Sequence, residues 1–350
     1  MSSDDFAAEF AALRRFSARI GNDPLLTQAA GGNTSIKDGE TLWIKASGTW
    51  LAHAEERDIL VPVRFLPLIE AVQAESPEAE QAHLFTIAEA NPSGLRPSIE
   101  TTVHALMPQR VVAHMHCVDT ISLAVRQKPV AELTRLLDGL NWAYVPYHRP
   151  GLPLARGIAL HRAQRPDVLV LGNHGLVVAA ETVEAVELLL DLVKQRLAQP
   201  VRKAPEPDIA RLINLAGENY RLPASEHAHA VANDETSLAL ARGGNLYPDH
   251  VIFLGVGSVV AQDGENADAI VSRLGYQPPA ILFPGRGVLM RKDCSAAADA
   301  MARCLADVLV RVPRGATLRY LSAEENYELT NWDAEKYRQS LDAKSQGAVP

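Results

Sequence analysis

Several features that mark particular classes of protein are scarce in this sequence. Only three cysteines occur among 350 residues, and Cys117, Cys294 and Cys304 lie far apart. A sparse, odd number of cysteines does not form a disulfide framework, so we expect a reduced protein. The longest apolar runs, such as residues 168–171 and 252–254, have the length of a strand and do not approach a membrane span.

Positive charge is also in deficit. The chain has 34 Lys and Arg residues against 42 Asp and Glu residues, which gives a formal net charge of −8. This balance argues against nucleic acid or an anionic membrane as the main partner, although a small anionic substrate could still bind at a locally positive site. Residues 1–6 are polar and acidic and lack the pattern of a signal peptide, so we expect a cytoplasmic protein.

The composition that remains, 47% hydrophobic and 22% charged, is typical of a soluble globular protein. Strand-like and helical patterns alternate along the chain, which predicts an α/β fold with a central β-sheet flanked by helices. Residues 199–207 carry three prolines with mixed charge and form the best candidate linker. We therefore predict a first domain over residues 1–198 and a second, smaller α/β domain of unknown role over residues 208–350.

The periodicity of apolar residues gives the expected elements. Helical spacing predicts helices at residues 4–20, 67–90, 97–106, 130–140, 183–197, 208–220 and 296–312. Short apolar and β-branched runs predict strands at 42–46, 59–62, 111–116, 168–171, 176–179, 251–254 and 280–283. Residues 29–38 are expected to form a glycine-rich loop. The glycine pairs that follow residues 254 and 284 lack the third glycine of a dinucleotide fingerprint, so they are interpreted as turns.

Two histidines at the end of a strand-like run are the first candidate for chemistry. His114 and His116 are two residues apart, so on a strand they point to the same face and can converge on one ion. An isolated pair of this kind could equally be held by backbone carbonyls on a sheet face. His174 follows Gly172 and Asn173 in a tight turn between two apolar runs, and it is the best candidate for a third ligand.

A carboxylate and two small-residue segments complete the candidates. Glu100 follows Pro97 and Ser98, where an acidic residue would ordinarily complement the dipole of a helix, but near a metal it could shuttle a proton. Residues 31–35 and 45–48 combine glycines, hydroxyls and a lysine, which is a plausible cradle for phosphate. Each of these segments alone is a weak signal, because most glycine-rich loops are simply turns.

Taken together and in order, these motifs resemble the class II aldolase/adducin family. The resemblance covers about residues 6–198 and is carried by the motifs GGNTS, IKASG, PSIE, HMH and GNHG. It implies a divalent metal, zinc in that family, on His114, His116 and His174, and it implies that Glu100 is catalytic. The phosphate-binding loops of the family fall on Gly32, Asn33, Ser47, Gly48 and Ser98, and Tyr147 matches a tyrosine that the family carries into the site of a neighbouring subunit.

The second half of the chain narrows this resemblance. The segment WIKASGTWLA, the segment that begins at Pro248 and the segment AILFPGRGVLM are closer to the aldolase part of bifunctional rhamnulose-phosphate aldolase/alcohol dehydrogenases than to short fuculose-phosphate aldolases. An acidic aromatic stretch at residues 327–337 fits the same group, although the sequence of the tail, NWDAEKYRQ, departs from the pattern of that group. The chain has no dehydrogenase domain after it, so we do not expect the bifunctional activity.

The resemblance implies a lyase that reversibly cleaves a ketose phosphate to dihydroxyacetone phosphate and an aldehyde through a metal-stabilised enediolate. Glu100 would move the proton on the carbon, for which a pKa near neutrality would help, and Tyr147 would protonate the aldehyde oxygen. The partners expected are a small sugar phosphate and further copies of the chain in a homo-oligomer. An epimerase, decarboxylase or dehydratase on the same site, an adducin-like binding module without catalysis and a metal-stabilised structural protein are the alternatives.

Overall fold

The computed structural model describes residues 3–333 and divides the chain into two compact units. The first unit contains residues 1–120 and 130–198, and the second contains residues 121–129 and 199–350. The domain boundaries predicted above stay a prediction. The part of the predicted aromatic stretch from residue 334 onward lies outside the described residues.

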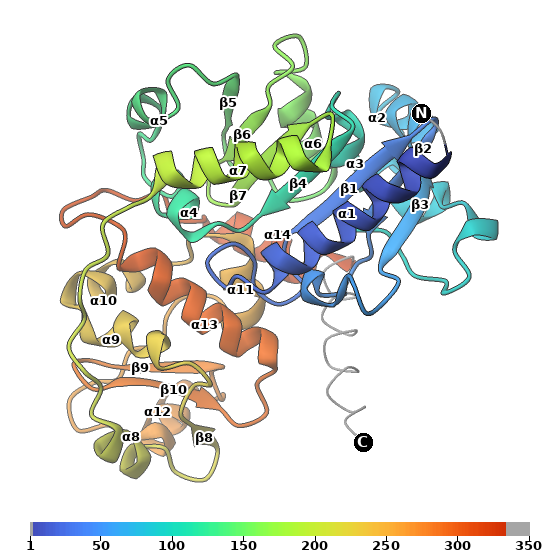
Figure 1. Cartoon of the computed structure of the whole chain (residues 1–350). Coiled ribbons are helices and arrows are strands. Elements are labelled where there is room, and N and C mark those ends of the chain that lie inside the picture. The colour runs from blue at the N-terminus through green and yellow to red at the C-terminus, as the bar shows by residue number, and fades with distance from the viewer. Residues whose placement is uncertain (1–2, 334–350) are drawn as a thin grey trace. The chain divides into compact units, whose positions relative to one another are not determined.

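A seven-stranded mixed sheet forms the centre of the first unit (Figure 1). Its order is β3-β2-β1-β4-β7-β6-β5, and all neighbouring strands are antiparallel except β5 and β6. The strands are β1 (Asn33–Asp38), β2 (Thr41–Lys45), β3 (Leu60–Arg64), β4 (Val111–Met115), β5 (Trp142–Val145), β6 (Val168–Leu171) and β7 (Gly175–Ala180). The central strands β4, β6 and β7 are apolar almost throughout, as expected for strands that are covered on both faces.

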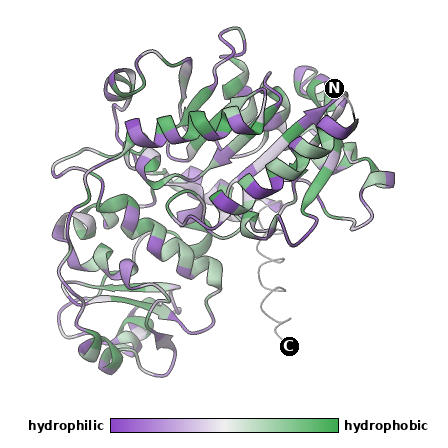
Figure 2. Cartoon of the chain, viewed as in Figure 1, coloured by the Kyte–Doolittle hydropathy of each residue, from purple (hydrophilic) through white to green (hydrophobic). Residues whose placement is uncertain are grey.

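Helices cover the two faces of this sheet. Helices α1 (Ser3–Gly21) and α7 (Val183–Leu197) pack against each other and lie along one face. Helices α2 (Phe65–Gln73), α3 (Thr101–Leu106) and α6 (Leu152–Ala159) share an apolar core with the other face. Figure 2 shows both hydrophobic and hydrophilic residues along α7, whose buried residues are Val183, Val186, Leu190, Val193 and Leu197. The first unit is therefore a three-layer α/β structure, which confirms the predicted fold class.

The second unit has a small antiparallel sheet of order β8-β10-β9, covered by helices. Its strands are β8 (Tyr220–Arg221), β9 (Ala280–Phe283) and β10 (Gly287–Arg291). Its helices include α8 (Ile209–Leu215), α9 (Ala230–Asn233), α10 (Glu235–Ala241), α11 (Pro248–Leu254), α12 (Ala267–Leu274), α13 (Ala296–Leu309) and α14 (Ala323–Asn331). Two further helices are α4 (Val118–Ala124), which begins in the first unit, and α5 (Val130–Leu136) within it. Within residues 3–333, no helix is long and apolar enough to cross a membrane.

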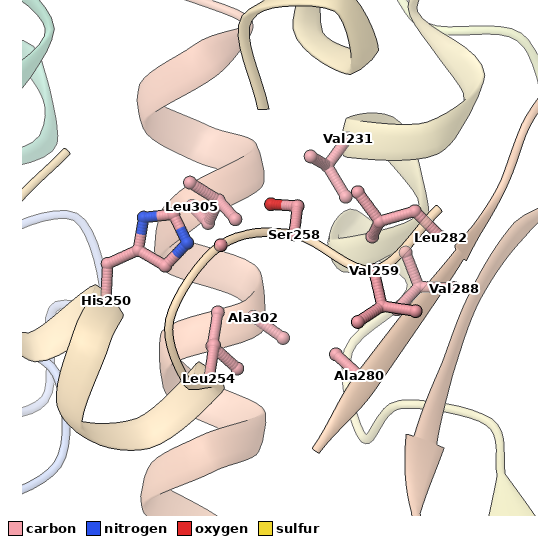
Figure 3. Close-up of a pocket in the computed structure, with 11 residues that line it drawn as sticks. Val231, His250, Leu254, Ser258, Val259, Ala280, Leu282, Val288, Ala302 and Leu305 are labelled. Atoms are coloured by element: carbon pink, nitrogen blue, oxygen red, sulfur yellow. The ribbon is translucent and has the colours of Figure 1, made fainter. Parts of the chain in front are cut away.

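His250 is a buried titratable group of this second unit. It lines a cavity of about 20 Å³, among apolar side chains from α9, α11, α13 and both longer strands (Figure 3). Its Nδ1 accepts a hydrogen bond from the backbone N–H of Leu246, so the ring is neutral with its proton on Nε2. Burial lowers the pKa of His250 to about 4.

Several element predictions were wrong, and each has a local cause. The helix expected at 67–90 ends at Gln73, because Glu75 adopts a positive φ of 54° and Pro77 opens a short 3₁₀ turn. The run at 251–254 is the end of helix α11, since Pro248 stands in its first turn and Gly255, with φ 84°, ends it. Residues 33–38 form strand β1 rather than a loop.

Candidate metal centre

The two histidines of the HMH motif lie at one end of strand β4. His114 is within the strand and His116 follows its last residue, Met115. Strand β4 is paired on both sides, with Asn33 of β1 opposite His114 and Leu176 of β7 opposite Met115. The middle of the sheet therefore fixes the backbone that carries both imidazoles.

His174 reaches the same place from the tight turn between β6 and β7. Leu171 and Gly175 are cross-strand partners at this turn, and the N–H of His174 donates to the carbonyl of Leu171 at 3.2 Å. Asn173 adopts a left-handed conformation with φ 51°, which asparagine tolerates better than most residues. At Gly175, a Cβ would lie 2.3 Å from the carbonyl oxygen of Met115, so a side chain there would push β7 away from β4.

The three rings form a compact buried group. Their centroids are 4.8–5.2 Å apart, and the side chains of His114, His116 and His174 are 1–7% exposed. One nitrogen from each ring lies within 4.8 Å of the other two. Ligand nitrogens around a tetrahedral zinc, each about 2.0–2.1 Å from the ion, are about 3.4 Å apart. The donor set and its spacing therefore fit one divalent ion after a small inward rotation of the rings.

A backbone carbonyl orients His114 for this role. Its Nδ1 lies 3.1 Å from the carbonyl oxygen of Leu176, which can only accept, so Nδ1 carries the proton. The Nε2 atom of His114 then carries the lone pair of the ring and lies 3.4 Å from Oε2 of Glu100. A hydrogen bond from the outer nitrogen to a carbonyl is the usual way in which a ligating histidine is held.

Glu100 places its carboxylate directly against the histidines. Oε2 lies 3.4 Å from Nε2 of His114, and Oε1 lies 3.4 Å from Nε2 of His174. Burial raises the pKa of Glu100, but the imidazoles of His114 and His174 in their charged forms and a hydrogen bond from Asn33 outweigh it and lower the pKa to about 2. A carboxylate with this pKa is ionised at neutral pH, whereas a pKa nearer neutrality would help a group that both takes and returns a proton.

The same distances leave two roles open to Glu100. A separation of 3.4 Å from two imidazole nitrogens is the spacing between ligands that share one small ion. It is also close enough for a carboxylate to reach a substrate that occupies the open coordination position. Glu100 therefore fits either a fourth ligand or a proton carrier.

The loops expected to bind phosphate meet beside Glu100. Asn33 Nδ2 donates to Glu100 Oε2 at 2.9 Å and to Ser98 Oγ at 3.2 Å. Ser98 Oγ also accepts from the N–H of Glu100, and helix α3 begins only at Thr101, because Pro97 forms a β-bridge with Ala46 instead of opening the helix. Asn33 and Ser98 are thus brought together with the three histidines.

The remaining loop residues lie in the adjoining backbone. The N–H of Ser47 donates to the carbonyl of Arg96, and the N–H of Ser98 donates to the carbonyl of Lys45, so the two loops are joined. Gly48 has φ 74° and Gly32 has φ 66°, which are conformations that favour glycine. A Cβ on Gly32 would lie 2.9 Å from the carbonyl oxygen of His114, so this loop packs directly on the strand that carries two of the candidate ligands.

Tyr147 lies at the same end of the strands as the three histidines. Strands β5 and β6 are parallel and end together at Val145 and Leu171, and the N–H of Gly172 donates to the carbonyl of Val145. A Cβ on Gly172 would lie 3.0 Å from the backbone nitrogen of Tyr147. The backbone of Tyr147 is therefore close to the His174 turn of its own chain, and its part in the site stays a prediction.

Two residues at the site, His104 and Gly31, were not predicted from the sequence. His104 is fully buried, with Nδ1 2.7 Å from Ser35 Oγ and Nε2 bonded to Asn33 Oδ1. Its spacing of four residues from Glu100, which precedes the first residue of helix α3, was the signal that could have drawn attention to it. Gly31 is the second, because a Cβ there would lie 2.8 Å from Nδ1 of His116.

A three-layer α/β unit with three buried histidines and a carboxylate at one end of its sheet is the arrangement that the motifs led us to expect. The model of the family described as "Class II Aldolase and Adducin N-terminal domain" matches residues 16–198. The chain belongs to this family.

One curated protein is similar to this chain over most of its length. The chain is 27% identical over 399 residues to "Uncharacterized oxidoreductase YuxG" of Bacillus subtilis (strain 168), with 92% of this chain and 57% of that protein aligned. The chain thus spans little more than half the length of this relative.

Solved structures resemble the chain over about half its length. The N-terminal class II aldolase domain of a conserved protein from Thermoplasma acidophilum is 28% identical, with a TM-score of 0.46, over 53% of this chain and 90% of that one. The l-fuculose-1-phosphate aldolase from Thermus thermophilus is 18% identical, with a TM-score of 0.38, over 55% of this chain and 91% of that one.

Proposed function

We propose that this protein is a metal-dependent aldolase that reversibly cleaves a ketose phosphate to dihydroxyacetone phosphate and an aldehyde. The observation that supports it most is the buried group of His114, His116 and His174 with the carboxylate of Glu100 3.4 Å from two of their nitrogens. Three imidazoles form the donor set of a catalytic site that keeps an open position. When bound there, zinc or another divalent ion supplies a Lewis acid for the carbonyl oxygen of the substrate.

The residues of the chain then divide the remaining work. Glu100, ionised and buried, accepts a proton from the carbon next to the carbonyl in the direction of synthesis and returns it in the direction of cleavage. Ser98, Ser47 and the backbone around Gly32 and Gly48 offer hydroxyl and N–H groups for the phosphate of the substrate. Tyr147 donates its phenolic proton to the aldehyde oxygen as the carbon–carbon bond forms.

The experiment that tests this proposal combines metal analysis with product analysis. The protein as purified is expected to hold about one divalent ion per chain, and a screen of ketose 1-phosphates is expected to release dihydroxyacetone phosphate. Coupled reduction of dihydroxyacetone phosphate follows the cleavage, and mass spectrometry identifies the second product. Protein that holds metal but releases no dihydroxyacetone phosphate from any ketose phosphate would overturn the aldolase proposal.

The alternatives give different products on the same site. An epimerase would return a sugar phosphate of unchanged mass, a decarboxylase would release carbon dioxide, and a dehydratase would release water. An adducin-like binding module would hold no metal and turn over nothing. The buried imidazoles and the adjacent carboxylate disfavour this last interpretation, because four ionisable groups are costly to bury without a charged or coordinating partner.

A further inference from the structure

A chain of four buried side chains runs from strand β1 to the carboxylate of the candidate metal centre. Ser35 Oγ lies 2.7 Å from His104 Nδ1, and His104 Nε2 is hydrogen-bonded to Asn33 Oδ1. Asn33 Nδ2 then donates to Glu100 Oε2 at 2.9 Å. All four side chains are at least 94% buried, since their exposed fractions are 0–6%.

The acceptor at one end of this chain, the carboxylate of Glu100, decides where its protons lie. Asn33 Nδ2 lies 2.9 Å from Glu100 Oε2, so Asn33 turns its NH₂ group toward the carboxylate, whose oxygen accepts. That orientation leaves the carbonyl oxygen of Asn33 facing His104, and a carbonyl oxygen also accepts only. His104 therefore carries its proton on Nε2, and its Nδ1 accepts from the hydroxyl of Ser35.

The surroundings of His104 agree with this assignment. The ring is fully buried on helix α3, and burial lowers its pKa to about 3, which keeps it neutral. Ser35 and Asn33 belong to the same strand and point to the same face of the sheet, since they are two residues apart. One imidazole thus bridges two side chains of β1 and holds both in place.

We propose that His104 is a positioning residue, which holds the amide of Asn33 so that Glu100 keeps the orientation needed for proton transfer. Without a donor at the Nε2 position, the amide of Asn33 could turn over and present its oxygen to the carboxylate. Two acceptors would then face each other, and Glu100 would swing away from its present place between His114 and His174. The inference rests on the proposed function, because it assigns His104 to the carboxylate that carries the proton there.

Two conservative variants separate positioning from a merely structural role. His104→Gln places an amide nitrogen where Nε2 stands and can donate to Asn33. His104→Asn places its amide nearer the Nδ1 position and cannot reach Asn33. Both variants are polar and neutral, and neither side chain is larger than histidine. Their effects on packing, and so on stability, should therefore be comparable.

The expected result is a selective loss of turnover. His104→Asn lowers kcat by about tenfold to thirtyfold, as for one lost hydrogen bond in the transition state, while KM changes by less than about threefold. His104→Gln keeps kcat within about threefold of the original protein. Metal content stays unchanged in both variants. Equal losses in the two variants, or no loss in His104→Asn, would overturn the proposal.

A second measurement does not depend on any enzymatic activity. Nuclear magnetic resonance of ¹⁵N-histidine-labelled protein, with His104 assigned by its absence in His104→Gln, is expected to show a neutral ring protonated on Nε2 between pH 6 and pH 8. A ring protonated on Nδ1, or a cationic ring, would overturn the positioning role. If the protein cleaves no ketose phosphate but His104 shows the Nε2 proton, the proposed function fails while the hydrogen-bonded chain stands.

Discussion

Single residues of the candidate metal centre have proposed roles that substitution can separate. His114→Ala, His116→Ala and His174→Ala are each expected to lose the bound ion, because three protein ligands are the minimum for an open site. Glu100→Gln removes a proton acceptor and leaves the imidazoles in place. We expect this variant to keep its metal while turnover falls by roughly two to four powers of ten. Elemental analysis and cleavage rates, measured on the same preparations, check both expectations.

The distances around Glu100 make the outcome of this comparison informative. If Glu100→Gln lost its metal together with its activity, the carboxylate would be a ligand rather than a proton carrier. If it kept both, another group would have to move the proton, and the catalytic part of the proposal would be wrong even with an intact metal site.

Gly31 tests how closely the loop approaches a ligand. A Cβ added there would lie 2.8 Å from Nδ1 of His116 and 2.9 Å from the carbonyl oxygen of Gln28. Gly31→Ala is therefore expected to displace the ring and weaken metal affinity by about tenfold to a hundredfold, as for other lost supports of a ligand. Competition with a chromophoric chelator measures this affinity.

A glycine elsewhere provides the control. Gly94→Ala introduces a Cβ with no atom within 4 Å, although its φ of 62° makes the substitution strained. This variant should lose about 1 kcal/mol of stability and keep its metal affinity. Equal metal binding by Gly31→Ala and the original protein would show that the loop yields easily.

The sequence was enough to predict that three histidines converge, but not what holds their rings. His114, His116 and His174 stand in short motifs whose order is specific. By contrast, the bond from His114 to the carbonyl of Leu176 depends on the register between β4 and β7, and any residue could supply that carbonyl. The partner of His104 is similarly fixed by the pairing of β1, a segment whose glycines and small residues favour a loop in the sequence.

At the scale of elements, helix α7 begins with a side-chain cap that can be tested. Thr182 accepts a hydrogen bond from the N–H of Ala185, and the helix then covers strands β4 and β7 of the sheet. Thr182→Ala is expected to lower the free energy of unfolding by about 1 kcal/mol. Thr182→Ser keeps the accepting oxygen and should lose much less. Urea denaturation followed by circular dichroism checks the pair, and equal losses would show that the cap is unimportant.

The elements themselves differ in how well the sequence predicts them. Helix α7 has the bounds that the sequence predicts, because its apolar residues recur at helical spacing without interruption. The end of α11 is wrongly predicted as a strand, since Val251, Ile252 and Phe253 are typical of strands and outweigh the helix-opening Pro248 in the pattern. Strand β5 is missed, because four residues at the edge of a sheet carry little periodicity.

For the molecule as a whole, buried histidines predict a loss of stability in mild acid. The pKa of His250 is lowered from an ordinary 6.5 to about 4. Between these two pH values the unfolded chain binds a proton at this residue and the folded chain does not. Stability is therefore complete above pH 6.5 and falls as the pH drops toward 4, by up to about 3 kcal/mol from this residue. Urea denaturation at pH 7.5 and at pH 5 measures the difference.

The variant His250→Asn isolates this contribution. An asparagine oxygen can still accept from the N–H of Leu246, but it does not titrate. The difference in the free energy of unfolding between pH 7.5 and pH 5 should become smaller in this variant. The free energy of unfolding at pH 7.5 itself should change less than this difference does. An unchanged dependence on pH would assign the effect to other groups.

The expected homo-oligomer can be tested through Tyr147. If Tyr147 acts in the site of a neighbouring subunit, mixing Glu100→Gln with Tyr147→Phe should restore activity, because some hybrid sites then contain both original residues. Sedimentation velocity gives the size of the assembly. A monomer, or mixtures that never regain activity, would place Tyr147 in its own site, near the turn of His174, or outside the reaction.

Residues 121–129 join the second unit although they lie in the middle of the first unit's sequence. They are held there by backbone contacts: Gln127 donates to Thr317, Arg319 donates to Val125, and Arg126 forms a β-bridge with Leu318. A gene fragment that encoded only the family-matched residues 16–198 would therefore express this segment without the strand-like partner that pairs with it. A single recombination event after residue 198 would replace residues 317–319 but keep residues 121–129. The new second unit would then have to supply the same pairing, so the two parts of the sequence cannot be exchanged independently.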